Sequence, residues 1–122
     1  MEDNKQLILV ALDDLLKLDD VLACMFAKKE LEGLVPNALK IKDVELWELL
    51  KAATDNMFDI VAKFFNYGLT RMVFELGNYN IIVAPLNEQF SLLVVVPALA
   101  NTGLLDVEIE NTKRKIKHIM ER

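Results

Sequence analysis

Cysteine is almost absent from this 122-residue sequence, and its scarcity limits the chemistry that the chain can perform. Cys24 is the single cysteine, so no disulfide can form within the chain and no cysteine pair with metal-ligand spacing exists. It stands in the apolar run VLACMFA without a basic neighbour that would lower its pKa, which favours a buried structural thiol over a nucleophile. We therefore expect a reduced protein in the cytoplasm.

Glycine and histidine are also scarce. The four glycines are isolated from one another, whereas a phosphate-binding loop needs several close together, so we expect no nucleotide bound in this way. The only histidine, His118, follows a run of basic residues near the end of a predicted helix, where a surface residue is commoner than a catalytic base. We expect no catalytic residue, no cofactor and no metal ion, and therefore no enzyme.

Positive charge and long apolar runs are the remaining shortages. Fourteen lysines and arginines stand against 19 acidic residues, and the net charge of −5 leaves no basic footprint for nucleic acid. No run approaches the ~20 apolar residues of a membrane span, and the opening MEDNKQLILV lacks the pattern of a signal peptide. With 53% hydrophobic residues the chain is expected to fold, as a single domain over residues 1–122.

Three segments have apolar residues at every third or fourth position, which predicts amphipathic helices. The first lies between Lys5 and Leu18. The second runs from about Asp43, a good N-cap, to Asn66, and Gly68 follows where a left-handed residue commonly ends a helix. The third begins after NTG, and its acidic first half and basic second half match the helix dipole. The buried stripes predicted for the two terminal helices are Leu7, Ala11, Leu12, Leu15 and Leu18, and Leu105, Ile109, Ile116, Ile119 and Met120.

The remaining segments predict strands. The runs at 21–27 and 92–96 are apolar throughout, so both are expected in the middle of a sheet and paired with each other. LEGLV is a weaker strand that ends at Pro36, which places it at an edge. From Leu69 onward an alternating strand and two tight turns predict a three-stranded antiparallel meander.

The predicted fold is α/β of the α+β kind, a three-layer α/β/α sandwich. The element order is helix, strand, strand, helix, strand, strand, strand, helix. A five-stranded antiparallel sheet with the long helix on one face and both terminal helices on the other satisfies all the apolar patterns.

The long helix carries more apolar residues than one buried face needs. Leu46, Leu50, Ala53, Met57, Val61 and Phe64 form one stripe, and Trp47, Phe58 and Phe65 widen it. The alternating strand TRMVFEL has neither a proline nor a run of lysines to protect an edge. A symmetric dimer would cover both features. The predicted interface residues are Trp47, Leu50, Met57, Phe58, Val61, Arg71, Val73 and Glu75.

The run FELGNYNIIVAPLNEQFSLLVVVPALANTGLLDVEIENTKRKI, with the element order, resembles the roadblock/dynein light chain family. The similarity is to its prokaryotic stand-alone members of the mutual-gliding B type, and it implies a roadblock/profilin-like fold. The chain departs from the family at Lys28, Lys29 and Glu30, where members often have an Asp-Gly turn.

The resemblance implies a non-catalytic homodimer in which the middle strands of two copies pair and the long helices pack antiparallel. Such dimers act as scaffolds or regulators of Ras-like small GTPases, so a GTPase is the implied partner. Acidic residues of the long helix are the candidate contacts: Glu45, Glu48, Asp55 and Asp59. Two alternatives stay open, namely a structural adaptor subunit of a larger complex and a small-ligand sensor domain with a pocket among the methionines and aromatics.

Overall fold

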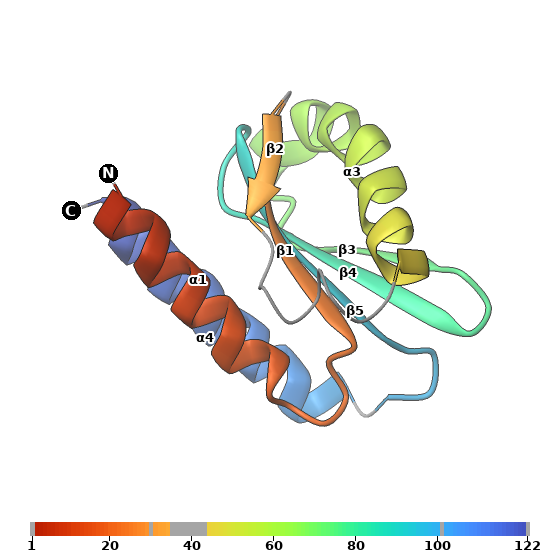
Figure 1. Ribbon diagram of the computed structural model, residues 1–122. Helices are drawn as coiled ribbons and strands as arrows, with labels where there is room; N and C mark the ends of the chain where they lie inside the picture. The colour runs from red at the N-terminus through yellow and green to blue at the C-terminus, as the bar shows by residue number, and fades with distance from the viewer. Residues whose placement is uncertain (1, 30, 35–43, 101, 122) are drawn as a thin grey trace.

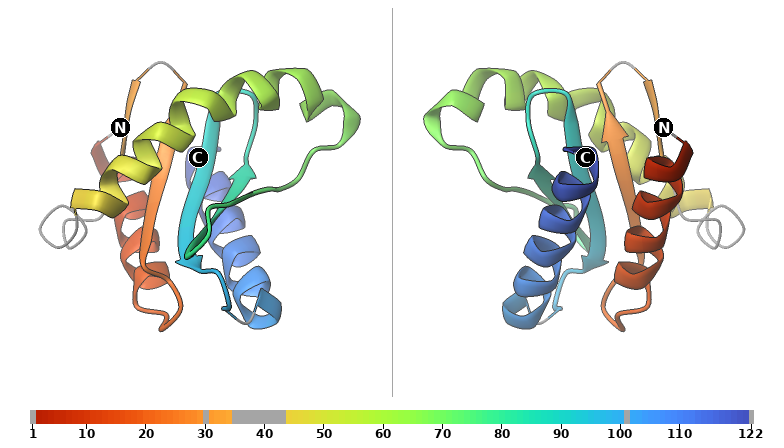
Figure 2. Two further views of the ribbon diagram at one scale, coloured as in Figure 1. Left: turned by 90° about the vertical axis from the view of Figure 1, so that its right-hand side faces the viewer. Right: turned by 90° about the vertical axis from the view of Figure 1, so that its left-hand side faces the viewer.

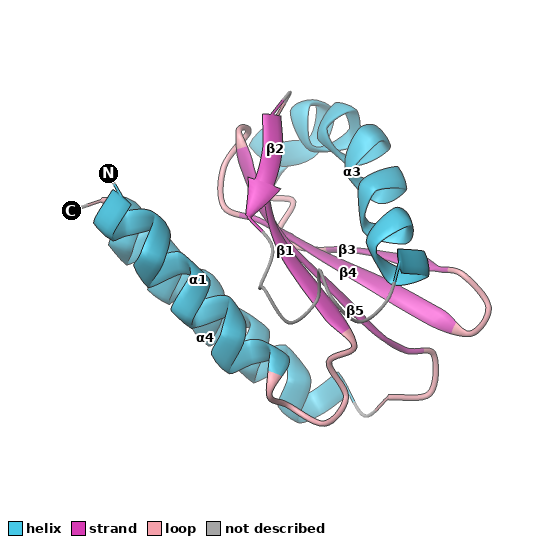
Figure 3. Cartoon of the chain, viewed as in Figure 1, coloured by secondary structure: helices cyan, strands magenta, loops and turns pink. Residues whose placement is uncertain are grey.

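The computed structural model describes residues 2–29, 31–34, 44–100 and 102–121. Within these residues the helices are α1 (Glu2–Leu16), α3 (Val44–Phe64) and α4 (Thr102–Met120), with a short 3-10 turn, η1 (Phe65–Tyr67), after α3. The strands are β1 (Ala23–Lys28), β2 (Leu31–Leu34), β3 (Met72–Glu75), β4 (Tyr79–Pro85) and β5 (Phe90–Pro97). Figures 1 and 3 show their arrangement, a mixed α/β fold as predicted.

The strands form one antiparallel sheet in the order β2-β1-β5-β4-β3. All of β1 pairs with β5, from Ala23 with Val95 to Lys28 with Phe90. This confirms the prediction that these strands pair in the interior of the sheet. β3, β4 and β5 form the expected meander, and β2 and β3 occupy the two edges.

The sheet separates two hydrophobic clusters. Leu92, Val94 and Val96 of β5 pack with the inner faces of α1 and α4, whereas Leu93 and Val95 point to the opposite face and pack against α3. Successive strand residues point to opposite faces, so an unbroken apolar strand supplies both clusters. Figure 2 shows α3 on one side of the sheet and the two terminal helices on the other.

The helix boundaries and faces differ in detail from the prediction. Ile8, rather than Leu7, is buried on α1, and Leu7 stays 38% exposed. The last helix begins at Thr102, so it includes Gly103. The long helix gives way to the 3-10 turn at Phe65, and Gly68 follows with φ of +90°, the left-handed end that the sequence predicted.

The first hairpin has an irregular register. Phe26 pairs with Leu34 and Lys28 pairs with Leu31, so the register shifts between these two positions of β1. This shift lies where the sequence departs from the Asp-Gly turn of the family. The predicted strand end at Pro36 and the predicted N-cap Asp43 lie outside the described residues.

Candidate functional site

The open edge of β3 is the first feature of the candidate site. β3 pairs with β4 through Met72–Val83, Val73–Ile82, Phe74–Ile81 and Glu75–Asn80, and no other described strand lies on its far side. Met72 and Phe74 are partly buried and pack into the cluster under α3. Val73 is 42% exposed, and Glu75 is also exposed. The backbone of this edge is therefore available to pair with another strand.

Arg71, just before β3, is tied to its own protomer. Its guanidinium forms an ion pair with the carboxylate of Asp106 in the first part of α4, and both side chains are partly exposed. An ion pair of this exposure contributes at most about 1 kcal/mol. The pair joins the start of the edge strand to α4 of the same protomer, and the role of Arg71 at a dimer interface stays a prediction.

The inner face of α3 corrects the sequence prediction. Leu50, Met57 and Val61 have no exposed surface, and Phe58 is 6% exposed. These four predicted interface residues pack against the strands of their own chain, as part of the cluster with Leu93. Side chains that fill the protomer core cannot also contact a second copy. The side chain of Trp47, a fifth predicted interface residue, lies outside the described part of the chain.

Other residues of α3 expose apolar surface to solvent. Ile60 is 37% exposed and Phe64 is 50% exposed, and they lie one helical turn apart on the same side of α3. After α3, Tyr67 and Leu76 are also exposed. The sequence analysis did not single out Ile60, although its spacing of four from Phe64 is a signal that could have found the pair.

The acidic candidates lie on the outward face of α3. Glu48, Asp55 and Asp59 are exposed, and their spacing of seven and four residues places them along one stripe of the helix. This stripe faces away from the sheet, since Leu50, Met57 and Val61 occupy the opposite side. The side chain of Glu45 lies outside the described part of the chain.

Cys24 is a buried thiol of the core, as the sequence predicted. It has no exposed surface, and its S–H donates to the carbonyl oxygen of Leu12 with an S···O distance of 3.4 Å. Burial, followed by the negative charge of Asp13, raises the pKa of the thiol to about 12. A thiol held in its protonated form is a poor nucleophile.

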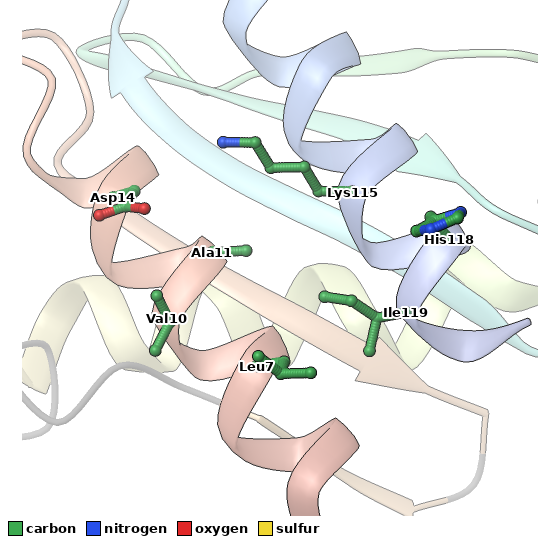
Figure 4. Close-up of a pocket in the computed structure, with 7 residues that line it drawn as sticks. All are labelled: Leu7, Val10, Ala11, Asp14, Lys115, His118 and Ile119. Atoms are coloured by element: carbon green, nitrogen blue, oxygen red, sulfur yellow. The ribbon is translucent and has the colours of Figure 1, made fainter. Parts of the chain in front are cut away.

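A shallow groove runs between α1 and α4 (Figure 4). Its volume is about 230 Å³, which is smaller than the roughly 300–1,000 Å³ of typical small-molecule pockets. The groove is lined by Leu7, Val10, Ala11 and Asp14 of α1 and by Lys115, His118 and Ile119 of α4. His118 is exposed there, as expected for a surface histidine.

Two kinds of feature are missing from the described residues. None of their helices is both long and apolar enough to cross a membrane. The same residues contain no group of three or more histidine, cysteine, aspartate and glutamate side chains placed to hold a metal ion.

Solved structures with the same architecture identify the fold. No family model matches the sequence, and no curated protein does so either. A Roadblock/LC7 domain from Streptomyces avermitilis matches with a TM-score of 0.62 at 14% identity, over 93% of this chain and 97% of that one. The chain thus has the roadblock/LC7 fold that the sequence resemblance implied.

Structures of MglB also match. MglB from Myxococcus xanthus gives a TM-score of 0.74 at 13% identity, over 93% of this chain and 94% of that one. The gliding protein MglB from Thermus thermophilus gives 0.72 at 15% identity, over 97% of this chain and 91% of that one. Identities this low establish a common fold, and function must be argued from the surfaces of this chain.

Proposed function

We propose that this protein is a non-catalytic homodimeric scaffold that regulates a Ras-like small GTPase. The open edge of β3 is the observation that carries the proposal, because an unprotected edge strand is suited to pair with a second copy of itself. The roadblock/LC7 fold and its similarity to two MglB structures support the same function. The sequence resemblance supplies the GTPase as the partner.

In the proposed dimer, the β3 strands of two copies pair antiparallel across a two-fold axis. Met72 and Phe74 pack into the same cluster as the inner face of α3, so a copy that reaches β3 also comes close to α3. Ile60 and Phe64 would then lose water-exposed apolar surface, which favours association. Val73 and Glu75 belong to this interface as residues of the pairing strand, and Arg71 stands at its start.

The β3 pairing can be tested with two lysine substitutions of exposed residues. Val73→Lys puts a charge on the pairing strand, and Phe64→Lys puts one on the apolar side of α3. Both side chains are substantially exposed in the protomer, so folding should be preserved. We expect each variant to be monomeric in light scattering at micromolar concentration. A folded Val73→Lys protein that stayed dimeric would place the interface elsewhere.

The outward acidic stripe of α3 is the proposed GTPase contact. Glu48, Asp55 and Asp59 are exposed and free of the protomer core, and pairing two copies would bring two such stripes onto one assembly. A partner with a basic surface patch would be attracted to this face, and the attraction would weaken as salt is raised.

A binding experiment tests the GTPase assignment directly. Purified Ras-like GTPases from the same genome are loaded with GDP or with a non-hydrolysable GTP analogue and passed over the immobilised protein. We expect one of them to bind, and the Asp55→Lys/Asp59→Lys variant to bind at least about 10-fold more weakly. Glu88→Lys/Glu121→Lys, which makes the same change in net charge at two exposed residues outside α3, is the matched charge control and should bind normally. Failure of every GTPase in both nucleotide states would reject the assignment.

A structural adaptor subunit of a larger complex is the second candidate. A matched structure is described as MglB with a tetrameric arrangement, at 15% identity and a TM-score of 0.71, so a protein of this fold also occurs in an assembly larger than a dimer. An adaptor would copurify with several unrelated subunits and would bind none of the isolated GTPases. The same binding experiment, followed by mass spectrometry of proteins copurified from the native host, separates the two functions.

A further inference from the structure

The groove between α1 and α4 is not used by the proposed dimer. It lies in the helical layer on the opposite side of the sheet from α3 (Figure 1). Figure 4 shows its residues, which come from segments near the two ends of the chain. An association through this groove is therefore separate from the pairing of β3.

Apolar surface remains uncovered along the groove. Val10 is 55% exposed and Leu7 is 38% exposed, although both belong to a helix that packs on the core. Ile119 completes the apolar part from the side of α4. Covering these side chains would remove apolar area from water and stabilise a complex.

The two walls of the groove carry opposite charge. Asp14 projects from α1, while Lys115 and His118 project from α4, with the Lys115 side chain extending toward α1 (Figure 4). Asp14 also has Lys17, in the turn directly after α1, at 3.6 Å, an exposed pair of the kind that contributes little. An occupant that fits this groove must present positive charge to α1 and negative charge to α4.

We propose that the occupant is a second copy of the same α1–α4 pair. The helices run antiparallel, so that Leu7 lies at about the level of Ile119 and Asp14 at about the level of Lys115 (Figure 4). A two-fold axis parallel to the groove lays α1 of one copy on α4 of the other at the same level. Asp14 of each copy then lies opposite Lys115 of the other copy. The exposed side of Val10 is covered in both copies.

This arrangement satisfies the charge requirement from the chain itself. The acidic wall of each copy faces the basic wall of the other copy. The two-fold symmetry therefore repeats the same contact twice. Because the exposed apolar area is small, the association should be weak and should appear only at high protein concentration. Combined with the pairing of β3, it would join dimers into larger assemblies.

Charge reversal tests the contact between copies. Asp14→Lys places like charges opposite each other in a pair of identical copies, and so does Lys115→Glu. We expect each variant alone to raise the dissociation constant of this association by about 10-fold or more. When the two variants are mixed, the introduced lysine of one copy would meet the introduced glutamate of the other. The unchanged Asp14 and Lys115 would meet as in wild type, so both contacts would again be attractive between unlike copies.

The experiment is light scattering of wild type, of each variant and of their equimolar mixture, from roughly 1 µM to 1 mM. We expect the mean mass of the mixture to exceed that of either variant alone and to approach that of wild type. Any pairing through β3 raises the mass equally in all four solutions. The absence of β3 pairing could therefore not produce the expected difference between the mixture and the separate variants. Glu88→Lys and Lys117→Glu carry the same charge changes on exposed residues outside the groove, and they should match wild type.

Two outcomes would overturn the proposal. One is a mixture whose mass equals the average of the separate variants at every concentration. The other is a wild-type protein whose mass, across the whole range, is no greater than that of Asp14→Lys. In either case the groove would be left for a different occupant or for none.

Discussion

The two faces of the sheet are covered in different ways. On one face α1 and α4 lie side by side, and together they pack against Ile82, Leu92 and Val94. On the other face the single helix α3 packs against Leu93 and Val95. Figure 2 shows the helix pair on one side and the lone helix on the other.

Each face of the sheet leaves a different surface available for association. On the side of α3, β3 keeps an open edge and α3 keeps exposed apolar residues beside its core face. Two helices cover more of the sheet, but a groove remains where their outer sides meet. We assign the first surface to dimerisation and the second to further self-association.

The largest expected effect separates the core of α3 from its exposed side. Met57→Lys buries a charge without a partner and should lower the free energy of unfolding by about 4 kcal/mol or more. Ala52→Lys, five residues earlier on the outward side of α3, places its charge at an exposed position and should cost less than about 1 kcal/mol. Urea denaturation followed by circular dichroism measures both. Equal losses would mean that the inner and outer sides of α3 are wrongly assigned.

The next effect compares the two faces directly. Leu92→Ala and Leu93→Ala remove the same atoms from adjacent, fully buried residues of β5 that point to opposite faces. We expect each to lower the free energy of unfolding by about 2–5 kcal/mol. The loss should be smaller for Leu93, because a lone helix can move toward the sheet and partly fill the cavity. A larger loss at Leu93 would contradict this view of the α3 face.

A smaller effect belongs to the face covered by two helices and depends on pH. The pKa of the Cys24 thiol rises from an ordinary value of 9.0 to about 12 in the folded protein. Between these pH values the unfolded chain releases a proton that the folded protein retains, so stability falls as pH rises. We expect wild type to lose about 1 kcal/mol more than Cys24→Ala between pH 8 and pH 10. If urea denaturation showed the same change with pH in the free energy of unfolding for both proteins, the burial of the thiol would be contradicted.

The smallest expected effect concerns the ion pair between β3 and α4. Arg71→Ala or Asp106→Ala should lower the free energy of unfolding by less than about 1 kcal/mol, and added salt should reduce the difference. A double-mutant cycle measures the coupling between the two side chains. A coupling well above this value would show that the pair fixes the edge strand more firmly than its exposure suggests.

Much of the fold could be predicted from the period of the apolar residues. The unbroken apolar runs at 21–27 and 92–96 indicated interior strands that pair, Pro36 indicated an edge strand, and the alternation in β3 indicated a half-exposed strand. The position of Gly68 marked the end of the long helix. These features depend on local sequence, so they can be recognised without coordinates.

The candidate site was less predictable, because it depends on how far the sheet covers each helix. The wide apolar arc of α3 suggested a second cover, but it could not show that Met57 and Val61 face the sheet of the same chain. On α1, a stripe through Leu7 was nearly as regular as one through Ile8, but in the structure Ile8 joins the buried cluster and Leu7 stays partly exposed. The α1–α4 groove combines residues from opposite parts of the sequence, so no local pattern predicted it.

The mass of the Asp14→Lys variant in solution tests the central claim most directly. This substitution should remove association through the groove and leave the pairing of β3 intact. Light scattering over a concentration series should therefore give a stable dimer at micromolar concentration for Asp14→Lys. The double variant Asp14→Lys/Val73→Lys should be a monomer. A protein that is monomeric with Asp14→Lys alone would contradict the homodimeric scaffold.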